Sequence, residues 1–419
     1  MFELLSMWLE WGLILSVTSV SVTMLMIVSA FFAILDEAME FYQVNRTMLL
    51  LLSNSFNIFY IIISPLMFHA FNKHYFPFVV ASTLATGVAA VGRYLAGSNY
   101  EVALIMTIII AVAHIPIITA PYGLLKLFPS WQVGYAASIP LFLPTLGINF
   151  CILYGMEYIA SDAEHKRPKT EVAEGINELN GIIAAVGVAS TLITLLLLFK
   201  LKSKIVGEGE AESKGEQQSF VGQTIDMYRK HSRTIMCIIS WGGILGINWT
   251  YGALFGIIFS GQGLSGKEVA LIGLAANLSS AVFSNLGTFL KSRIQTSYTR
   301  LISVLNMMGL VAATLITASK YLTVLQNLWL LIGLIVVLRA GYSSFVSLAF
   351  VEMEKSGIPS VIISGLFFWV ANVANLLGME LVDLVDSDFS MALLTLSVVI
   401  CVHFAAEAYI THSKAIQPI

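Results

Sequence analysis

The chain has 419 residues, of which 57% are hydrophobic and 11% are charged, and its formal net charge at pH 7 is −3. Soluble domains carry about a quarter charged residues, so this composition excludes an ordinary soluble protein. No Lys/Arg-rich arm occurs, and we expect no nucleic-acid partner. Cys151, Cys237 and Cys401 all lie in apolar runs, which argues against a disulfide framework or a Cys-ligated metal site.

Apolar runs of roughly 20 residues recur along the chain, the length that a helix needs to cross about 30 Å of hydrocarbon. Backbone amides have no water partners in lipid, so each run should be an α-helix. No small-residue cleavage site follows the first run, which we interpret as a retained helix and not as a signal peptide. The runs predict twelve transmembrane helices, at residues 11–34, 47–69, 76–97, 101–125, 132–155, 179–200, 234–258, 268–290, 300–318, 326–351, 360–384 and 390–411.

A hydrophilic stretch divides these helices into two groups of six. Residues 201–233 are rich in Gly, Glu, Lys, Ser and Gln, and we expect a flexible cytoplasmic linker between an N-terminal bundle (1–200) and a C-terminal bundle with a short tail (234–419). Of the 22 Lys and Arg residues, fourteen fall in segments that are cytoplasmic if both termini are inside, and six fall on the other side. This bias predicts cytoplasmic termini. We expect the plasma membrane as the location.

This organisation predicts an all-α membrane protein with the major facilitator fold, two pseudo-symmetric six-helix bundles. No strong sequence repeat relates the two halves, so the evidence for this fold is the symmetry of their hydropathy. The alternative is another twelve-helix carrier. In this fold each half consists of three-helix repeats, and the substrate site lies near the midplane between the halves. The first helix of each repeat then lines the central cavity.

Arg339 is an isolated charge about thirteen residues into predicted helix 326–351. Charge inside a membrane costs at least a few kcal/mol, so an intramembrane arginine is a functional candidate by default. One interpretation is contact with a substrate carboxylate or phosphate, which suits the planar guanidinium. The other is structural pairing with a carboxylate or with helix carbonyls.

Further polar side chains occur at similar depth in other predicted helices. His114 lies in helix 101–125 and could carry a proton, bind substrate or form a neutral contact between helices. Thr145 and Asn149 lie one turn apart in a Pro-containing helix, where bends and freed carbonyls help to form a cavity wall.

Two aromatic residues in helix 234–258, Trp249 and Tyr251, lie beside glycines. They could form a stacking or cation-binding wall, or they could reflect ordinary close packing of helices. Asn372 in helix 360–384 is a weaker candidate, because amides also hold helices together.

Two features are expected near the outer surface. Arg93 ends predicted helix 76–97, and we interpret it as an interfacial anchor. Asn45 begins the sequon Asn-Arg-Thr just outside the first helix, and it is a glycosylation candidate in a eukaryotic secretory membrane.

Four segments resemble the feline leukaemia virus subgroup C receptor-related family, solute carrier family 49. They match its helix 1–2 region, its helix 4–5 passage, helix 8 with the following loop, and its acidic helix 10–11 loop. In chain order they read "EFYQVNRTMLLLLSNSFNIFYIIISPLMF", "PYGLLKLFPSWQVGYAASIPLFLPTLGI", "IGLAANLSSAVFSNLGTFLKSRIQTSYTRLI" and "FVEMEKSGIPSVIISGLFFWVAN".

The resemblance implies a facilitator for small organic molecules such as choline, ethanolamine, haem or pyridoxine-like compounds. It places Tyr251 at a family aromatic position on helix 7, and it places the family's helix 5 glutamine near Thr145. The tryptophan of helix 1 falls on Val28, so half of the choline-binding aromatic pair is replaced. Arg339 would also repel a cation near it.

We therefore expect a transporter that moves a small organic solute with an anionic or zwitterionic group by alternating access. The expected partners are this solute and the lipid bilayer, with the protein acting as a monomer and needing no cofactor. No acidic residue lies at mid-depth in the predicted helices, which favours uniport or weak coupling. The alternatives are a non-transporting receptor or scaffold with the same fold and a membrane enzyme. The seven histidines are scattered, which argues against the enzyme.

Overall fold

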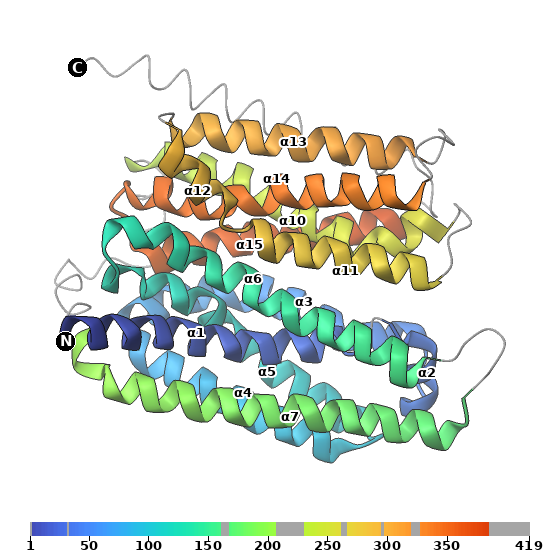
Figure 1. Ribbon diagram of the computed structural model, residues 1–419. Helices are drawn as coiled ribbons and strands as arrows, with labels where there is room; N and C mark the ends of the chain where they lie inside the picture. Colours follow the sequence, from blue (N-terminus) through green and yellow to red (C-terminus); the bar gives the residue numbers. More distant parts are fainter. Residues whose placement is uncertain are drawn as a thin grey trace, which may run out of the picture. The chain divides into compact units, whose positions relative to one another are not determined.

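The computed structural model is helical throughout the part of the chain that it describes (Figure 1). Predicted helix 390–411 and Cys401 lie outside this part. The described residues are 2–31, 33–160, 167–206, 230–260, 266–294, 297–319 and 327–384. No strand occurs within these ranges, so the prediction of an all-α protein is confirmed for them.

The chain divides into two compact units, and we describe each by itself. Unit 1 comprises Met1–Pro129 and Ile139–Gly215, and unit 2 comprises Ser130–Ser138 and Glu216–Ile419. In unit 1, α7 packs against α4 and α1, and α5 packs against α3 and α4 (Figure 1). Its helices are α1 (Phe2–Ser29), α2 (Leu35–Tyr42), α3 (Arg46–Lys73), α4 (Tyr75–Ala96), α5 (Tyr100–Gly123) with a 3-10 turn (Leu125–Leu127), most of α6 (Ser130–Tyr154) with a π-helical turn (Gly155–Ile159), and α7 (Lys169–Lys200).

Unit 2 contains the first residues of α6 and the helices that follow residue 230. In this unit α14 packs against α13 and α11, and α10 packs against α15. Close helix contacts are possible because small residues replace bulky ones where two backbones meet. The helices are α10 (Ser232–Ser260), α11 (Gly266–Phe283), α12 (Leu286–Arg293), α13 (Tyr298–Ala318), α14 (Leu328–Glu354) and α15 (Ser360–Leu384).

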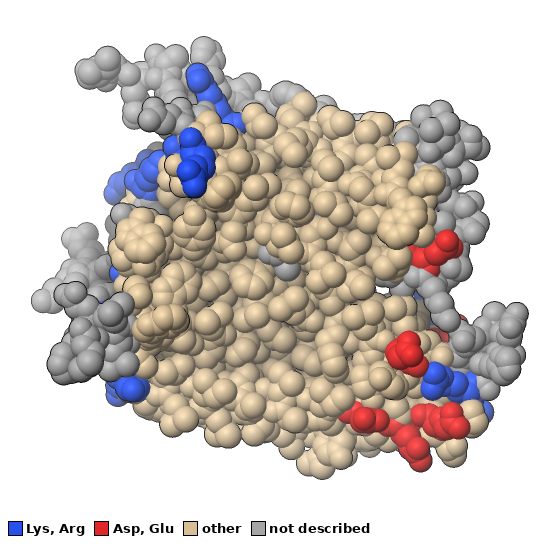
Figure 2. Space-filling model, in the orientation of Figure 1, with Lys and Arg blue, Asp and Glu red and all other residues tan. Residues whose placement is uncertain are grey.

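The helices have the length and surface expected in a bilayer. Eight helices among the described residues are long and apolar enough to cross a membrane. On the face shown in Figure 2, charged side chains gather at helix ends, and uncharged residues cover the stretches between them. Lipid-facing surface must be uncharged because the hydrocarbon solvates ions poorly.

The predicted helix 268–290 is broken in the structure, so the expectation of one continuous helix was wrong. Residues Ser284 and Asn285 form a turn between α11 and α12. Two serines of α14 donate hydrogen bonds to backbone carbonyls at this turn. The Ser344 hydroxyl lies 2.7 Å from the Phe283 carbonyl oxygen, and the Ser347 hydroxyl lies 3.4 Å from the Ser284 carbonyl oxygen. Hydroxyl partners of this kind permit a break inside a membrane helix.

The first residues of the expected linker (201–233) pack against unit 1. Residues 202–206 are helical, and Leu201 and Ile205 are buried. Lys204 forms an ion pair with Glu10 of α1, whose side chain is almost fully covered. The first residues after α7 are therefore packed onto unit 1, because their apolar side chains and this ion pair hold them there.

Arg93 is not an interfacial anchor, and this expectation was also wrong. Its side chain is 1% exposed on α4, and Nη1 donates to the Ile27 carbonyl of α1 at 3.1 Å and to the Thr107 hydroxyl of α5 at 3.2 Å. The Phe31 ring lies under the guanidinium, with its centroid 5.0 Å from the central carbon. Sequence position gave the depth of Arg93 along α4 but not the face from which it projects.

Candidate functional site

Arg339 joins two helices of unit 2. Its side chain is 4% exposed on α14, and Nη1 donates to two oxygens of Asn248 on α10: the side-chain amide oxygen at 2.8 Å and the backbone carbonyl oxygen at 3.1 Å. Hydrogen bonds from an ionised donor are about twice as strong as neutral ones. Asn248 is itself neutral, so these contacts orient the guanidinium and stabilise its charge without cancelling it.

Two further predicted residues of unit 2 lie on α10 and α15. Trp249 follows Asn248, and its ring is parallel to that of Phe368, with centroids 6.3 Å apart. Asn372 is buried, and its amide nitrogen donates to the Phe368 carbonyl of its own helix at 2.8 Å. Tyr251 belongs to α10, but its side chain lies outside the described part of the structure. Trp249 and Asn372 thus both contact Phe368 of α15, and Arg339 meets α10 at Asn248.

His114 lies in unit 1, on α5, with 7% of its side chain exposed. Its Nδ1 is 3.2 Å from the Met24 sulfur of α1. The rings of Phe56 and Tyr60 on α3 meet the imidazole edge-on, at centroid distances of 5.4 and 6.3 Å. A thioether and two aromatic rings are thus among its neighbours. The three interpretations of His114 remain predictions.

Thr145 and Asn149 also belong to unit 1, on α6. The Thr145 hydroxyl donates to the Phe142 carbonyl one turn back. Asn149 is 5% exposed, and neither its amide oxygen nor its amide nitrogen has a hydrogen-bond partner among the described residues. Buried amides are normally paired with protein, water or ligand, so Asn149 has the binding capacity that a solute or water would use.

The predicted residues thus fall into two sets: Arg339, Trp249 and Asn372 in unit 2, and His114, Thr145 and Asn149 in unit 1. Two partners of these residues, Asn248 and Met24, are not among the site residues predicted from the sequence. Asn248 carried a usable signal, since an amide inside an apolar run is itself unusual. A methionine among aliphatic residues carries no such signal.

Comparison with known proteins identifies the fold of the chain but not its family. No protein-family model matches it, and no curated protein is significantly similar to it. Solved structures do match over almost the whole chain. The transporter FucP in the outward conformation gives a TM-score of 0.70 at 15% identity, over 94% of this chain and 98% of that one. The chain has the major facilitator fold.

Other structures with the major facilitator fold agree. A bacterial homologue of the iron transporter ferroportin, in an outward-facing state with soaked iron, gives a TM-score of 0.72 at 11% identity, over 96% of this chain and 98% of that one. A variant of the E. coli fucose:proton symporter FucP gives 0.67 at 15% identity, over 95% and 99%. With eight described helices of membrane-spanning length, the chain is a multi-pass integral membrane protein.

The major facilitator fold gives the two sets of residues a common framework. In the predicted order of twelve membrane helices, α5 corresponds to the fourth and α14 to the tenth, and the expected three-helix repeats make these two helices pseudo-equivalent. The helices of Met24 and Asn248, α1 and α10, correspond to the predicted first and seventh helices, and the same expectation pairs them.

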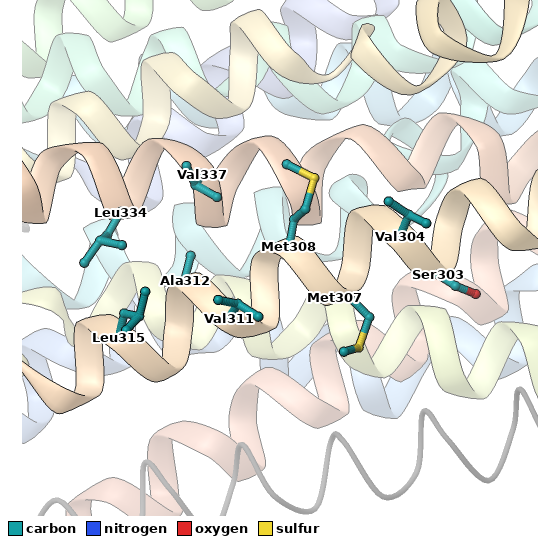
Figure 3. A pocket seen from close by; sticks show the side chains of 9 residues that line it. All are labelled: Ser303, Val304, Met307, Met308, Val311, Ala312, Leu315, Leu334 and Val337. Atoms are coloured by element: carbon teal, nitrogen blue, oxygen red, sulfur yellow. The ribbon is translucent and has the colours of Figure 1, made fainter. Parts of the chain in front are cut away.

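A surface groove on unit 2 has a different character. It has a volume of about 500 Å³ and is lined by α13 residues between Ser303 and Leu315 and by Leu334 and Val337 of α14 (Figure 3). Apolar side chains such as Val304 and Val311 are more than half exposed there. None of the predicted site residues lines it. Such a surface suits lipid chains, and we do not assign it to a polar solute.

Asn45 is exposed and caps α3. Its side-chain oxygen accepts a hydrogen bond from the Met48 amide at 2.9 Å. An N-cap of this kind contributes about 1 kcal/mol to stability. The sequon is therefore accessible, and its asparagine also has a structural role.

We predict that Asn45→Asp and Asn45→Ala separate these two roles. Both substitutions remove any glycan, which a gel-mobility shift after glycosidase treatment of protein from eukaryotic cells would reveal. Aspartate preserves the cap, so its thermal stability should equal that of unglycosylated wild type. Alanine should lose about 1 kcal/mol. Equal stability of the two variants would show that the cap contributes nothing.

Proposed function

We propose that this protein is a membrane transporter that moves a small organic solute by alternating access. The observation that carries the proposal is a buried arginine, Arg339, held by Asn248 at the contact of α14 and α10 in a chain with the major facilitator fold. Helices in these positions border the central pathway of this fold, where binding sites lie near the midplane. The transporters that the chain resembles in structure support the same function.

The chemistry of the site favours a solute with an anionic or zwitterionic group. The guanidinium forms paired hydrogen bonds with carboxylates and phosphates. Trp249, the residue after Asn248 on α10, offers an aromatic ring against which a flat or cationic part of the same molecule can stack. Haem-, choline/ethanolamine- or vitamin-like solutes are the classes that solute carrier family 49 suggests, and we place the protein near that family.

The remaining parts of the proposal concern organisation. We infer an N-terminal bundle (1–200), a cytoplasmic linker (201–233) and a C-terminal bundle (234–419), with both termini in the cytoplasm. The excess of Lys and Arg on one side of the predicted helices supports this orientation. We further infer a monomer in the plasma membrane that has no enzymatic activity.

The test is a ligand screen followed by an uptake assay. Purified full-length protein is screened by thermal shift against small carboxylates, zwitterions and cations, and the stabilising compounds are offered to proteoliposomes. We expect saturable uptake of an anionic or zwitterionic compound that equilibrates without a proton or sodium gradient. Saturable binding without uptake of any stabilising compound would instead indicate a receptor that keeps the fold.

A further inference from the structure

The apolar groove of unit 2 continues a face of α13 that begins with a basic residue. Residues three or four positions apart lie on the same face of a helix, and the α13 residues of the groove follow this spacing from Val304 to Leu315 (Figure 3). Arg300 is exposed and lies one turn before Val304, so it extends the same face. One side of α13 therefore carries a cation at its start and apolar side chains along the rest of its length.

The groove is open, and it is about as long as one leaflet of a bilayer. Ala312 lines it but is buried, whereas Val304 and Val311 are more than half exposed. From Ser303 to Leu315 the helix rises about 18 Å, at 1.5 Å per residue. The hydrocarbon of one leaflet is about 15 Å thick, which is half of the bilayer value. The groove can therefore hold an acyl chain along its length.

Basic side chains gather at the Arg300 end of this groove, where α12 and α14 end and α13 begins. The ammonium groups of Lys291 and Lys355 lie 4.9 and 4.3 Å from the centroid of the Tyr298 ring. Arg293 is exposed and is the last residue of α12. Figure 2 shows Lys and Arg side chains at this end of unit 2. We call Lys291, Arg293, Arg300 and Lys355 the basic patch.

An acidic neighbour neutralises part of the basic patch, but two of its cations keep their charge uncompensated. Lys355 forms an ion pair with Glu352 at 2.6 Å. Arg293 and Arg300 form no ion pair with any residue that the structure describes. The bias of basic residues toward one side of the membrane and the dipole of α12 both favour cations at this helix end. Neither effect explains why an open apolar groove begins at the same place.

We propose that unit 2 binds one anionic phospholipid, with its phosphate at the basic patch and an acyl chain in the groove. Phosphate accepts paired hydrogen bonds from a guanidinium, which suits Arg293 and Arg300. Basic pockets between membrane helices on the cytoplasmic side bind anionic headgroups, and the orientation proposed above places the basic patch on that side. The site does not include Arg339, and it does not depend on the proposed transport function.

Native mass spectrometry of the purified full-length protein in detergent tests the proposal, because it counts the lipids bound to each chain. The probes are dioleoylphosphatidylglycerol, dioleoylphosphatidylcholine and glycerol 3-phosphate. The double substitution Arg293→Gln and Arg300→Gln removes two charges from the basic patch. Its matched control is Lys126→Gln with Lys200→Gln, which removes two exposed lysines from unit 1.

The groove is tested separately from the basic patch. Val311→Trp places a large ring in the groove at an exposed position. Val282→Trp is its matched control, because Val282 of α11 is also exposed and does not line the groove. Both substitutions add a side chain at the surface of unit 2, so neither requires the core to repack.

We expect phosphatidylglycerol to bind at least about tenfold more tightly than phosphatidylcholine, and glycerol 3-phosphate not to displace it. Loss of one basic residue near a membrane surface weakens the binding of an anionic lipid about fivefold. The double arginine variant should therefore weaken phosphatidylglycerol binding about twentyfold and leave phosphatidylcholine unchanged. Val311→Trp should weaken both lipids about fivefold, because its ring replaces contacts with the chain. Both controls should bind as wild type does.

Three binding results would overturn the proposal. They are equal affinity for the two lipids, equal effects of the arginine variant and its control, and displacement of phosphatidylglycerol by glycerol 3-phosphate. Other occupants of the groove are detected with Val311→Cys and a short bismaleimide cross-linker in lipid bilayers. A cross-link to Cys401 of the same chain would place the C-terminal segment in the groove, and a covalent dimer would place a second copy there. Either product would also overturn the proposal.

Discussion

Arg339→Ala is expected to lower uptake of the preferred anionic or zwitterionic solute by about ten- to a hundredfold in proteoliposomes. Hydrogen bonds to a charged group contribute about 1.5–3 kcal/mol, and each 1.4 kcal/mol corresponds to a factor of ten. The substitution removes the guanidinium that Asn248 orients at the contact of α14 and α10. The loss should appear in kcat/KM, with the variant reconstituted at the same density as wild type.

Asn248→Ala provides the matched comparison, because it keeps the cation and removes the amide that positions it. We expect a smaller loss, about fivefold, because the cation remains and its hydrogen bond to the backbone carbonyl of residue 248 is kept. Arg339→Lys should lie between the two, since lysine carries the charge but lacks the planar fork. Unchanged uptake in a folded Arg339→Ala protein would remove Arg339 from the binding site.

The second large effect concerns packing. Gly246→Val is expected to prevent folding, because a Cβ at Gly246 would overlap the Ala371 carbonyl oxygen of α15 and lie 2.7 Å from the Ala374 Cβ. Overpacking of side chains costs about 1–3 kcal/mol, and here the opposing atom is backbone, so a whole helix must move. The folded yield after size-exclusion chromatography and the melting temperature measure the effect.

Gly243→Ala is the control in the same helix, three residues earlier. A Cβ there meets nothing within 4 Å. Alanine has the higher helix propensity, so stability should be unchanged or higher by up to about 1 kcal/mol. If Gly243→Ala and Gly246→Val lowered stability alike, close contact of α10 with α15 would not be the cause.

Much of the fold could be predicted because lipid imposes a simple rule on the backbone. A run that spans hydrocarbon must be helical, so hydropathy located most helices within a few residues. The rule does not apply where side chains form the hydrogen bonds that the backbone would otherwise lack. The short helix α2 lies outside the apolar runs, and the turn at Ser284 and Asn285 depends on hydroxyls from α14. Neither could be predicted from local hydropathy.

The sequence allowed the residues of the candidate site to be predicted, but not the neighbours that they contact. A lone Arg339 or His114 stands out in an apolar run, and both are buried. Which neighbours they meet depends on the rotation of each helix about its axis. Helices that are apolar all round carry little information on that rotation. The same limit explains Arg93, whose depth was clear and whose inward direction was not.

The joint between α11 and α12 has a mechanical consequence for the arginine of unit 2. Gly287 allows α12 to touch the backbone of α14 at Ser344, and hydroxyls of α14 hold the carbonyls at the joint. Arg339 precedes Ser344 on that same rigid rod by little more than one turn. A change in the angle between α11 and α12 would therefore either break the hydrogen bonds from Ser344 and Ser347 or move α14 with it. In the second case the bend between α11 and α12 would displace Arg339.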